Sequence, residues 1–300
     1  MFLRQLSILL GLCLASILGA CSDNNEPKEP IQPPPPTQAE LDAFIQKVTG
    51  DLIFVEGGSY TMGIDPSSFQ KGSAWQKHFS QFNAFHVHAS AMYPHKVTLD
   101  SFSISKYEVS WYEFDMYSRM MGLPLKGAQK REHSPSRYIP TRSAFYVSWY
   151  DAKNYCQWLG DLTELPFDLP TEAQWEYAAR ARGLDIPFAT HNGNYTRKDS
   201  DIPITEMHKH TPNPLGIYHM NGYQEEWVND WLSSTYYDES PENNPQGPET
   251  GDKKVIRGAS NGMSSRGFRN NYNRSGLRPT STAGIDTAFR CIAIIENPTH

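Results

Sequence analysis

Four consecutive prolines, Pro33 to Pro36, limit what the first part of this 300-residue chain can fold into. Proline fixes φ and has no N–H group to donate, so such a run cannot lie inside a helix or in a central strand. The stretch from residue 22 to residue 38 is polar apart from Ile31 and its prolines, and it cannot build a core. We therefore expect a stiff polyproline spacer, up to about 50 Å long at about 3.1 Å per residue.

Residues 1–20, ahead of this spacer, have the composition of an export signal. Arg4 is followed by an apolar run from Leu6 to Leu18, which is too short to span a bilayer. The run ends in Leu18-Gly19-Ala20-Cys21, the order of small residues before a cysteine that marks a bacterial lipobox. We expect cleavage before Cys21, lipidation of that cysteine and a tether over residues 21–36. The alternative is an ordinary secretory signal with a chance cysteine.

Lipidation of Cys21 would hold the protein at the periplasmic face of a bacterial membrane. Ser22, rather than an aspartate, follows the cysteine, which favours the outer membrane over the inner one. The formal net charge of -6 makes the chain a poor partner for nucleic acid or an anionic membrane surface. We therefore expect a lipid anchor and no nucleic-acid partner.

Cys156 and Cys291 are the two cysteines that follow Cys21 in the chain. In an oxidising compartment a single pair of cysteines forms a disulfide by default. The alternative is two buried free thiols.

From residue 37 onward, helix starts alternate with short strand patterns. A capping box places Ser or Thr three residues before Glu, Gln or Asp at the start of a helix. Such boxes begin at Thr37, Ser110, Ser148 and Thr171. Glycines after the first three boxes predict helix ends at Gly50, Gly122 and Gly160.

Apolar patterns predict strands over 52–55 and 60–62, and one longer strand over 97–107. After Arg182 we expect mainly turns and short strands. Because the chain has 21 Gly, 22 Pro and 12% aromatic residues, it should be loop-rich, with a core filled by aromatic rings. We predict one α+β domain over residues 37–300.

Several segments of this domain carry a recognisable pattern in a fixed order. They are 54–63, 95–109, 147–156, 169–180, and Arg257-Gly258-Ala259-Ser260 with Phe289-Arg290-Cys291. The segment 169–180, which reads LPTEAQWEYAAR, is the most specific. Together they resemble the formylglycine-generating enzyme, or sulfatase-modifying factor, family over roughly residues 51–295. The resemblance implies a compact, loop-rich fold related to C-type lectins, and it implies that Cys156 and Cys291 pair.

The chemistry of that family depends on two cysteines that this chain lacks. In the family's oxidase they follow an Arg-Gly-Gly-Ser turn and hold Cu(I), a soft ion that prefers thiolates. Here no cysteine occurs between Arg257 and Arg290. Counted without gaps, the two positions fall near Met263 and Phe268, neither of which supplies a thiolate. We therefore expect no copper and no formylglycine formation by that mechanism.

A calcium ion is the one metal for which the resemblance suggests a site. The family segment Gly-Asn-x-Trp-Glu-Trp reads here as 222–227, GYQEEW, so that its asparagine ligand has become Tyr223. Glu226 and Asp230 remain as oxygen ligands. The alternative is a structural glutamate beside a solvated acidic turn.

A basic and aromatic segment near the C-terminus is the predicted binding groove, where the family places its substrate. Arginine and aromatic side chains are favoured in protein-binding surfaces. The candidate residues are Met263, Arg266, Phe268, Arg269, Tyr272 and Arg274. The alternative, considered for Arg257 and Arg290, is a set of internal salt bridges.

Two functions fit these features. The first is a catalytically degenerate, lipid-anchored domain that binds an envelope or secreted protein in an accessory or immunity-type role. The second is a metal-dependent oxidoreductase of the same family, acting on a peptide or a secondary metabolite. The missing cysteines favour the first function, and the second stays open as the alternative.

Overall fold

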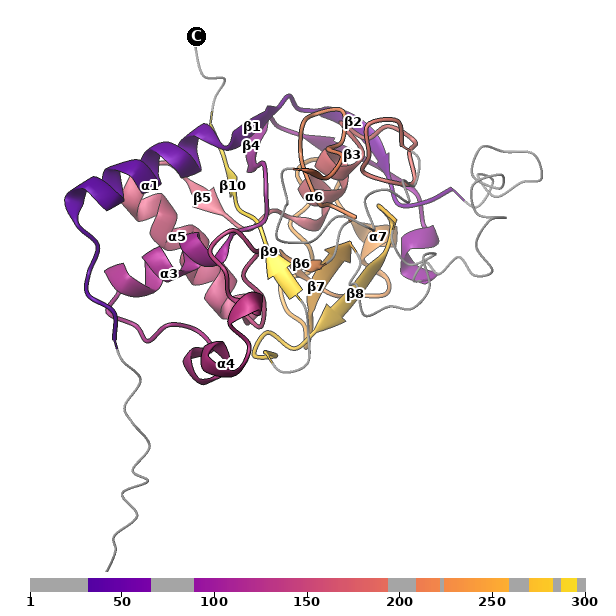
Figure 1. Cartoon of the computed structure of the whole chain (residues 1–300). Coiled ribbons are helices and arrows are strands. Elements are labelled where there is room, and N and C mark those ends of the chain that lie inside the picture. The colour runs from indigo at the N-terminus through magenta and orange to yellow at the C-terminus, as the bar shows by residue number, and fades with distance from the viewer. Residues whose placement is uncertain are drawn as a thin grey trace, which may run out of the picture.

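The structure, a computed structural model, describes residues 32–65, 89–193, 209–221, 224–258, 270–282 and 287–295 (Figure 1). The predicted signal and Cys21 lie outside these residues. Within the described ranges, none of the helices has both the length and the apolar character needed to cross a bilayer.

The first helix, α1 (Gln38–Gly50), begins at the predicted capping box of Thr37 and Glu40. The end of the proline spacer does not stand clear of the domain. Arg119 donates from Nε to the carbonyl oxygen of Pro34 at 2.9 Å, and its guanidinium also pairs with Glu40 at 3.0 Å. The side-chain amide of Gln32 donates to the carbonyl oxygen of Gly122. The described part of the spacer therefore lies against the domain.

Three further helices start at predicted caps: α3 (Trp111–Met120), α5 (Trp149–Thr163) and α6 (Glu172–Ala179). The predicted end of α5 at Gly160 is wrong, because the helix continues to Thr163 and ends at Glu164, whose φ is 58°. A Cβ on Gly160 would lie 3.0 Å from the carbonyl oxygen of Leu165. The glycine therefore allows close approach of the next segment and does not end the helix.

The first sheet joins distant parts of the chain in the order β1-β4-β10-β5, with all pairs antiparallel. Its strands are β1 (Leu52–Val55), β4 (Phe102–Ser105), β10 (Ile292–Ala293) and β5 (Phe167–Asp168). A separate pair consists of β2 (Gly58–Met62) and β3 (His95–Leu99).

The single strand predicted over 97–107 is therefore wrong, because β3 and β4 belong to different sheets. The chain turns at Asp100 and Ser101, where the Ser101 hydroxyl accepts a hydrogen bond from the N–H of Gly57 at 2.9 Å. A Cβ on Gly57 would meet the backbone of Leu99 at 2.4 Å, so the turn requires glycine there.

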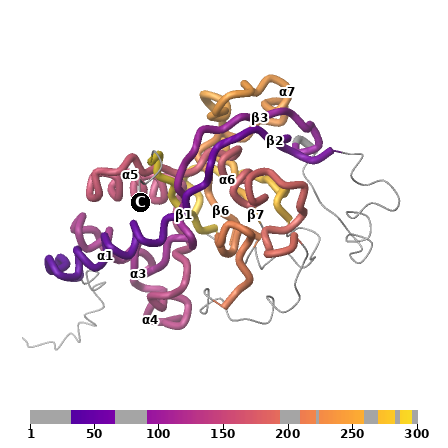
Figure 2. Tube along the Cα trace, turned by 90° about the horizontal axis from the view of Figure 1, so that it is seen from above, coloured from indigo at the N-terminus to yellow at the C-terminus, as the bar shows by residue number. Residues whose placement is uncertain are grey.

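The second sheet has the order β8-β7-β6-β9 and contains most of the strand residues that are described after Arg182. Its strands are β6 (Glu225–Trp231), β7 (Lys254–Gly258), β8 (Arg274–Leu277) and β9 (Thr287–Phe289). β6 and β9 run parallel, and the other pairs are antiparallel. Figure 2 shows α6 beside β6 and β7, and α6 also contacts β2. The other helices in the described residues are short: α4 (Ala128–His133), α7 (Tyr236–Glu239), and the 3-10 turns Ala89–Met92 and Pro135–Arg137.

Aromatic rings fill one of the two core clusters, as the composition predicted. Tyr155 of α5 stacks on Phe114 of α3 with ring centroids 5.9 Å apart and meets Phe289 of β9 at 5.4 Å. The predicted disulfide lies beside them: Cys156 and Cys291 are bonded, with Cα atoms 5.7 Å apart and both residues fully buried. The bridge joins α5 to the residue before β10.

Candidate binding site on the second sheet

Helix α6, which carries most of the LPTEAQWEYAAR segment, is buried along its whole length. Its two glutamates face the second sheet and meet arginines from it. Arg257 of β7 donates to Glu172 at 2.9 Å, to Glu176 at 2.7 Å and to the carbonyl oxygen of Asn271 at 2.7 Å. We call these side chains, together with Arg274 and Arg180, the α6 ion network.

Each glutamate of the network has a second arginine. Arg274 binds both oxygens of Glu172, at 2.7 and 2.8 Å, and Arg180 donates to Glu176 at 2.7 Å. Burial alone raises the pKa of Glu172, but Arg274 and Arg257 outweigh it, so the pKa ends below its ordinary value. The network is a set of compensated buried charges with a structural role.

The structure corrects the predicted groove at two positions. Tyr272 and Arg274 are 1% and 2% exposed, so neither presents a surface to a partner. The Tyr272 hydroxyl contacts Asp185 at 3.2 Å, and the Arg180 guanidinium lies 4.7 Å from its ring centroid. The other candidates, Met263, Arg266, Phe268 and Arg269, lie outside the described residues.

The two predicted calcium ligands have separate protein partners. Glu226 accepts hydrogen bonds from Arg290 at 2.7 Å and from the Trp175 indole at 3.0 Å. Asp230 accepts the N–H of Glu172 at 2.7 Å, and burial followed by the charge of Glu172 raises its pKa to about 7. Within the described residues no three His, Cys, Asp or Glu side chains gather as metal ligands. The contacts of Glu226 are those of a structural glutamate.

The cysteine chemistry of the domain does not fit Cu(I). Both cysteines after residue 21 are consumed in the buried Cys156–Cys291 disulfide, and a disulfide offers no thiolate. The segment between Arg257 and Arg290 contains no cysteine to replace them.

Glu225, which our sequence analysis missed, is the least compensated carboxyl on this sheet. It is 9% exposed, and among the described residues its carboxylate contacts only the Ser275 hydroxyl, at 3.4 Å. Burial raises its pKa to about 7. The signal was present in the sequence, because Glu225 occupies the first tryptophan position of the Gly-Asn-x-Trp-Glu-Trp pattern.

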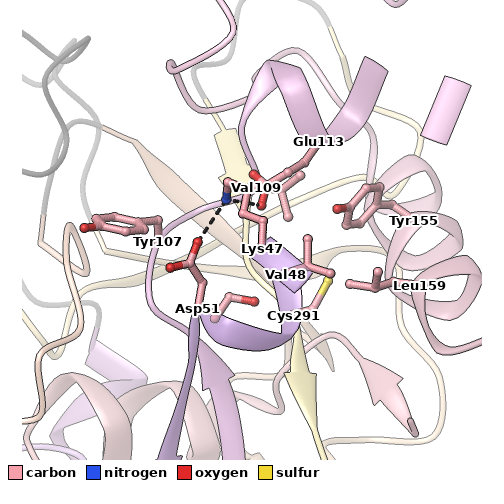
Figure 3. Close-up of a pocket in the computed structure, with 10 residues that line it drawn as sticks. Lys47, Val48, Asp51, Tyr107, Val109, Glu113, Tyr155, Leu159 and Cys291 are labelled. Atoms are coloured by element: carbon pink, nitrogen blue, oxygen red, sulfur yellow. Dashed lines mark hydrogen bonds and ion pairs between the residues drawn. The ribbon is translucent and has the colours of Figure 1, made fainter. Parts of the chain in front are cut away.

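The described hollows of the molecule lie elsewhere. A surface cleft of about 710 Å³ is lined by Phe54, Glu56, Asp100, Ser101, Arg182, Leu215, Ile294 and Ile295. A small, partly open pocket of about 20 Å³ lies beside Cys291, where Lys47 pairs with Asp51 and Glu113 at 3.0 Å each (Figure 3). The pocket holds at most one or two waters, so it is a packing void.

A family model described as the sulfatase-modifying factor enzyme 1-like domain matches residues 37–295, and the chain belongs to this family. The formylglycine-generating enzyme of Streptomyces coelicolor is 34% identical over 173 residues, covering 51% of this chain and 52% of that protein. The formylglycine-generating enzyme of Bos taurus is 26% identical over 307 residues, covering 81% of this chain and 74% of that protein. The chain thus spans about half the length of the Streptomyces relative.

Among solved structures, PvdO from Pseudomonas aeruginosa has the same fold. It superposes with a TM-score of 0.63 and 24% identity, covering 81% of this chain and 94% of that chain. This similarity establishes the loop-rich α+β fold that the sequence predicted.

Proposed function

We propose that this family member is a non-catalytic binding module that recognises an envelope or secreted protein. One observation carries the proposal: the domain has two cysteines, and they are bonded to each other inside the core. A copper oxidase of the family needs two free thiolates in the segment that follows Arg257. In this chain that segment contains no cysteine.

The binding surface in this proposal is the segment that leaves β7 at Gly258, with Arg266 and Arg269 as charged contacts. Arginine forms charge-assisted hydrogen bonds and stacks on rings without any bond-making step. Tyr272 and Arg274 belong to the buried interior and are not part of this proposed surface. An accessory or immunity-type role requires such binding and no turnover.

The first test is catalytic. Purified protein with added Cu(I), oxygen and a cysteine-containing peptide should produce no aldehyde, because no thiolate pair is present to hold the metal. The Streptomyces coelicolor relative, assayed in parallel, is the positive control. Conversion of the peptide to an aldehyde would refute the binding-only proposal and revive the oxidoreductase.

The same proposal is tested for binding with Arg269→Ala. A protein captured from envelope extract is identified, purified and titrated against wild type and variant. Truncating one central arginine should weaken binding by roughly 1 to 3 kcal/mol. Lys28→Ala, which removes a charge from the spacer, is the matched control and should bind as wild type does. Equal affinity of all three proteins would exclude this surface.

We also propose that the module is lipid-anchored on the periplasmic face of a membrane, the outer one if the cell has two. The support is the Leu18-Gly19-Ala20-Cys21 sequence followed by Ser22. Cys21→Ser should release the protein or leave its signal uncut. Membrane fractionation with mass measurement decides the matter, and a membrane-bound variant of mature size would exclude lipidation at Cys21.

A further inference from the structure

Three polar side chains come together on one face of the second sheet, opposite the face that carries the α6 ion network. Glu225 of β6 is in register with Thr287 of β9, so their side chains point to the same side. Ser275 of β8 lies across from Ile256, and Ile256 lies across from Trp227, two residues after Glu225. The Glu225–Ser275 contact at 3.4 Å confirms that these side chains share a face.

The oxygens of this cluster can form more hydrogen bonds than they form with the described residues. The Thr287 hydroxyl is fully buried and has no hydrogen-bond partner among the residues that the structure describes. A carboxylate has about four acceptor positions, and that of Glu225 engages one hydroxyl at a long distance. A buried polar group without a partner costs free energy. A hydrogen-bond donor that reached these oxygens would remove this cost.

The buried glutamates on the other face of the sheet do not share this deficit, although Nε of Arg257 has no hydrogen-bond partner there among the described residues. There, Glu172, Glu176 and Glu226 each accept hydrogen bonds from arginines at 2.9 Å or less. The sequence has therefore supplied a cation for each of these buried glutamates and has left Glu225 with a serine.

We propose that Glu225, Ser275 and Thr287 receive the ammonium group of a lysine side chain from the bound partner. An ammonium group has three N–H donors and no acceptor, and the cluster presents oxygens from three side chains. The flat five-donor guanidinium of arginine fits three oxygens on separate strands less well. Ser275 is partly exposed, so a long side chain can enter from the β8 side. This inference rests on the proposed binding function and names the chemistry of its partner.

The site is tested without knowing the partner, with n-butylammonium as the lysine mimic. Thermal unfolding of the full chain is followed at about pH 8, with tetramethylammonium, which has no N–H donor, at equal ionic strength as reference. n-Butylammonium should raise the Tm of wild type by about 2 °C or more over the reference. The rise should disappear in Glu225→Gln and shrink in Thr287→Val. Guanidinium is also a denaturant, so its effect on the Tm of Glu225→Gln is subtracted from its effect on the Tm of wild type. The remaining rise should be smaller than the rise produced by n-butylammonium at the same concentration.

The test requires that Glu225→Gln folds. The raised pKa of Glu225 predicts how the stability of this variant compares with that of wild type at each pH. Because that pKa rises from 4.5 to about 7 on folding, the native state keeps a proton that the unfolded chain loses. The stability contributed by Glu225 is therefore full below about pH 4.5 and lost as the pH rises through about 7. Glu225→Gln should be more stable than wild type at about pH 8, with the advantage vanishing in acid.

Two outcomes would overturn the assignment: an equal Tm rise in wild type and Glu225→Gln, or no difference between n-butylammonium and tetramethylammonium. Failure here is distinct from failure of the binding function. If Arg269→Ala weakens capture of the partner while n-butylammonium has no specific effect, the module binds its partner without this lysine contact. If n-butylammonium acts as expected but no protein is captured, the cation site stands and the protein-binding role fails.

Discussion

Arg257→Ala should lower the free energy of unfolding by about 3 to 5 kcal/mol, the usual cost of removing one partner from a buried ion pair. The guanidinium of Arg257 is fully buried and holds Glu172, Glu176 and the carbonyl oxygen of Asn271 at once. Alanine removes one of the two arginines from each glutamate, and the carboxylates that remain are then less fully compensated in a place that water does not reach. Arg257→Lys should recover little, because one ammonium group cannot span the two carboxylates as a guanidinium does.

The measurement is urea unfolding followed by circular dichroism. Arg182→Ala is the matched control, since Arg182 pairs with Glu56 at 2.7 Å on the surface, where both side chains are largely exposed. That pair should contribute little to stability, because water and salt screen exposed charges. Equal unfolding midpoints for Arg257→Ala and Arg182→Ala would show that the α6 ion network does not stabilise the fold.

Removing the disulfide with the double substitution Cys156→Ala and Cys291→Ala should cost about 5 kcal/mol in the chain-entropy description. The bridge closes a loop between residues 135 positions apart, so it strongly restricts the unfolded chain. In the native state it also fixes β10, a two-residue strand between β4 and β5.

A reductant series checks this second effect. Wild type should unfold at lower urea concentration once both thiols are free, as shown by alkylation and mass measurement. The double variant should be insensitive to the same reductant, which separates loss of the bridge from other effects of the reagent. An unchanged midpoint for the fully reduced wild type would contradict the expectation.

Local sequence signals predicted the helix starts, since a capping box is a contact between residues three positions apart. All four boxes, at Thr37, Ser110, Ser148 and Thr171, form as expected. The errors lie where distant contacts decide. Gly160 stays helical because the backbone near Leu165 packs against it, and the strand pattern over 97–107 hides a turn stabilised by Gly57.

The candidate site was harder to predict because burial depends on partners far along the chain. Tyr272 and Arg274 have the composition of a binding surface, but Arg274 pairs with Glu172, which is 102 residues away. No local pattern shows that α6 is buried on every side. Glu225 stands where the family has a tryptophan, but only the strand register and the burial of the sheet show that it lacks a cation.

The contact of Arg119 with the proline carbonyls has a consequence for how far a lipid-anchored domain can travel. If Cys21 carries the anchor, the free tether ends at Gln32 and not at residue 37, since Gln32 and Pro34 already contact the domain. At about 3.1 Å per residue, that length is about 34 Å rather than about 50 Å. The volume swept above the membrane scales with the cube of this radius and falls to about a third. A partner held at the same membrane therefore meets the module at about three times the local concentration.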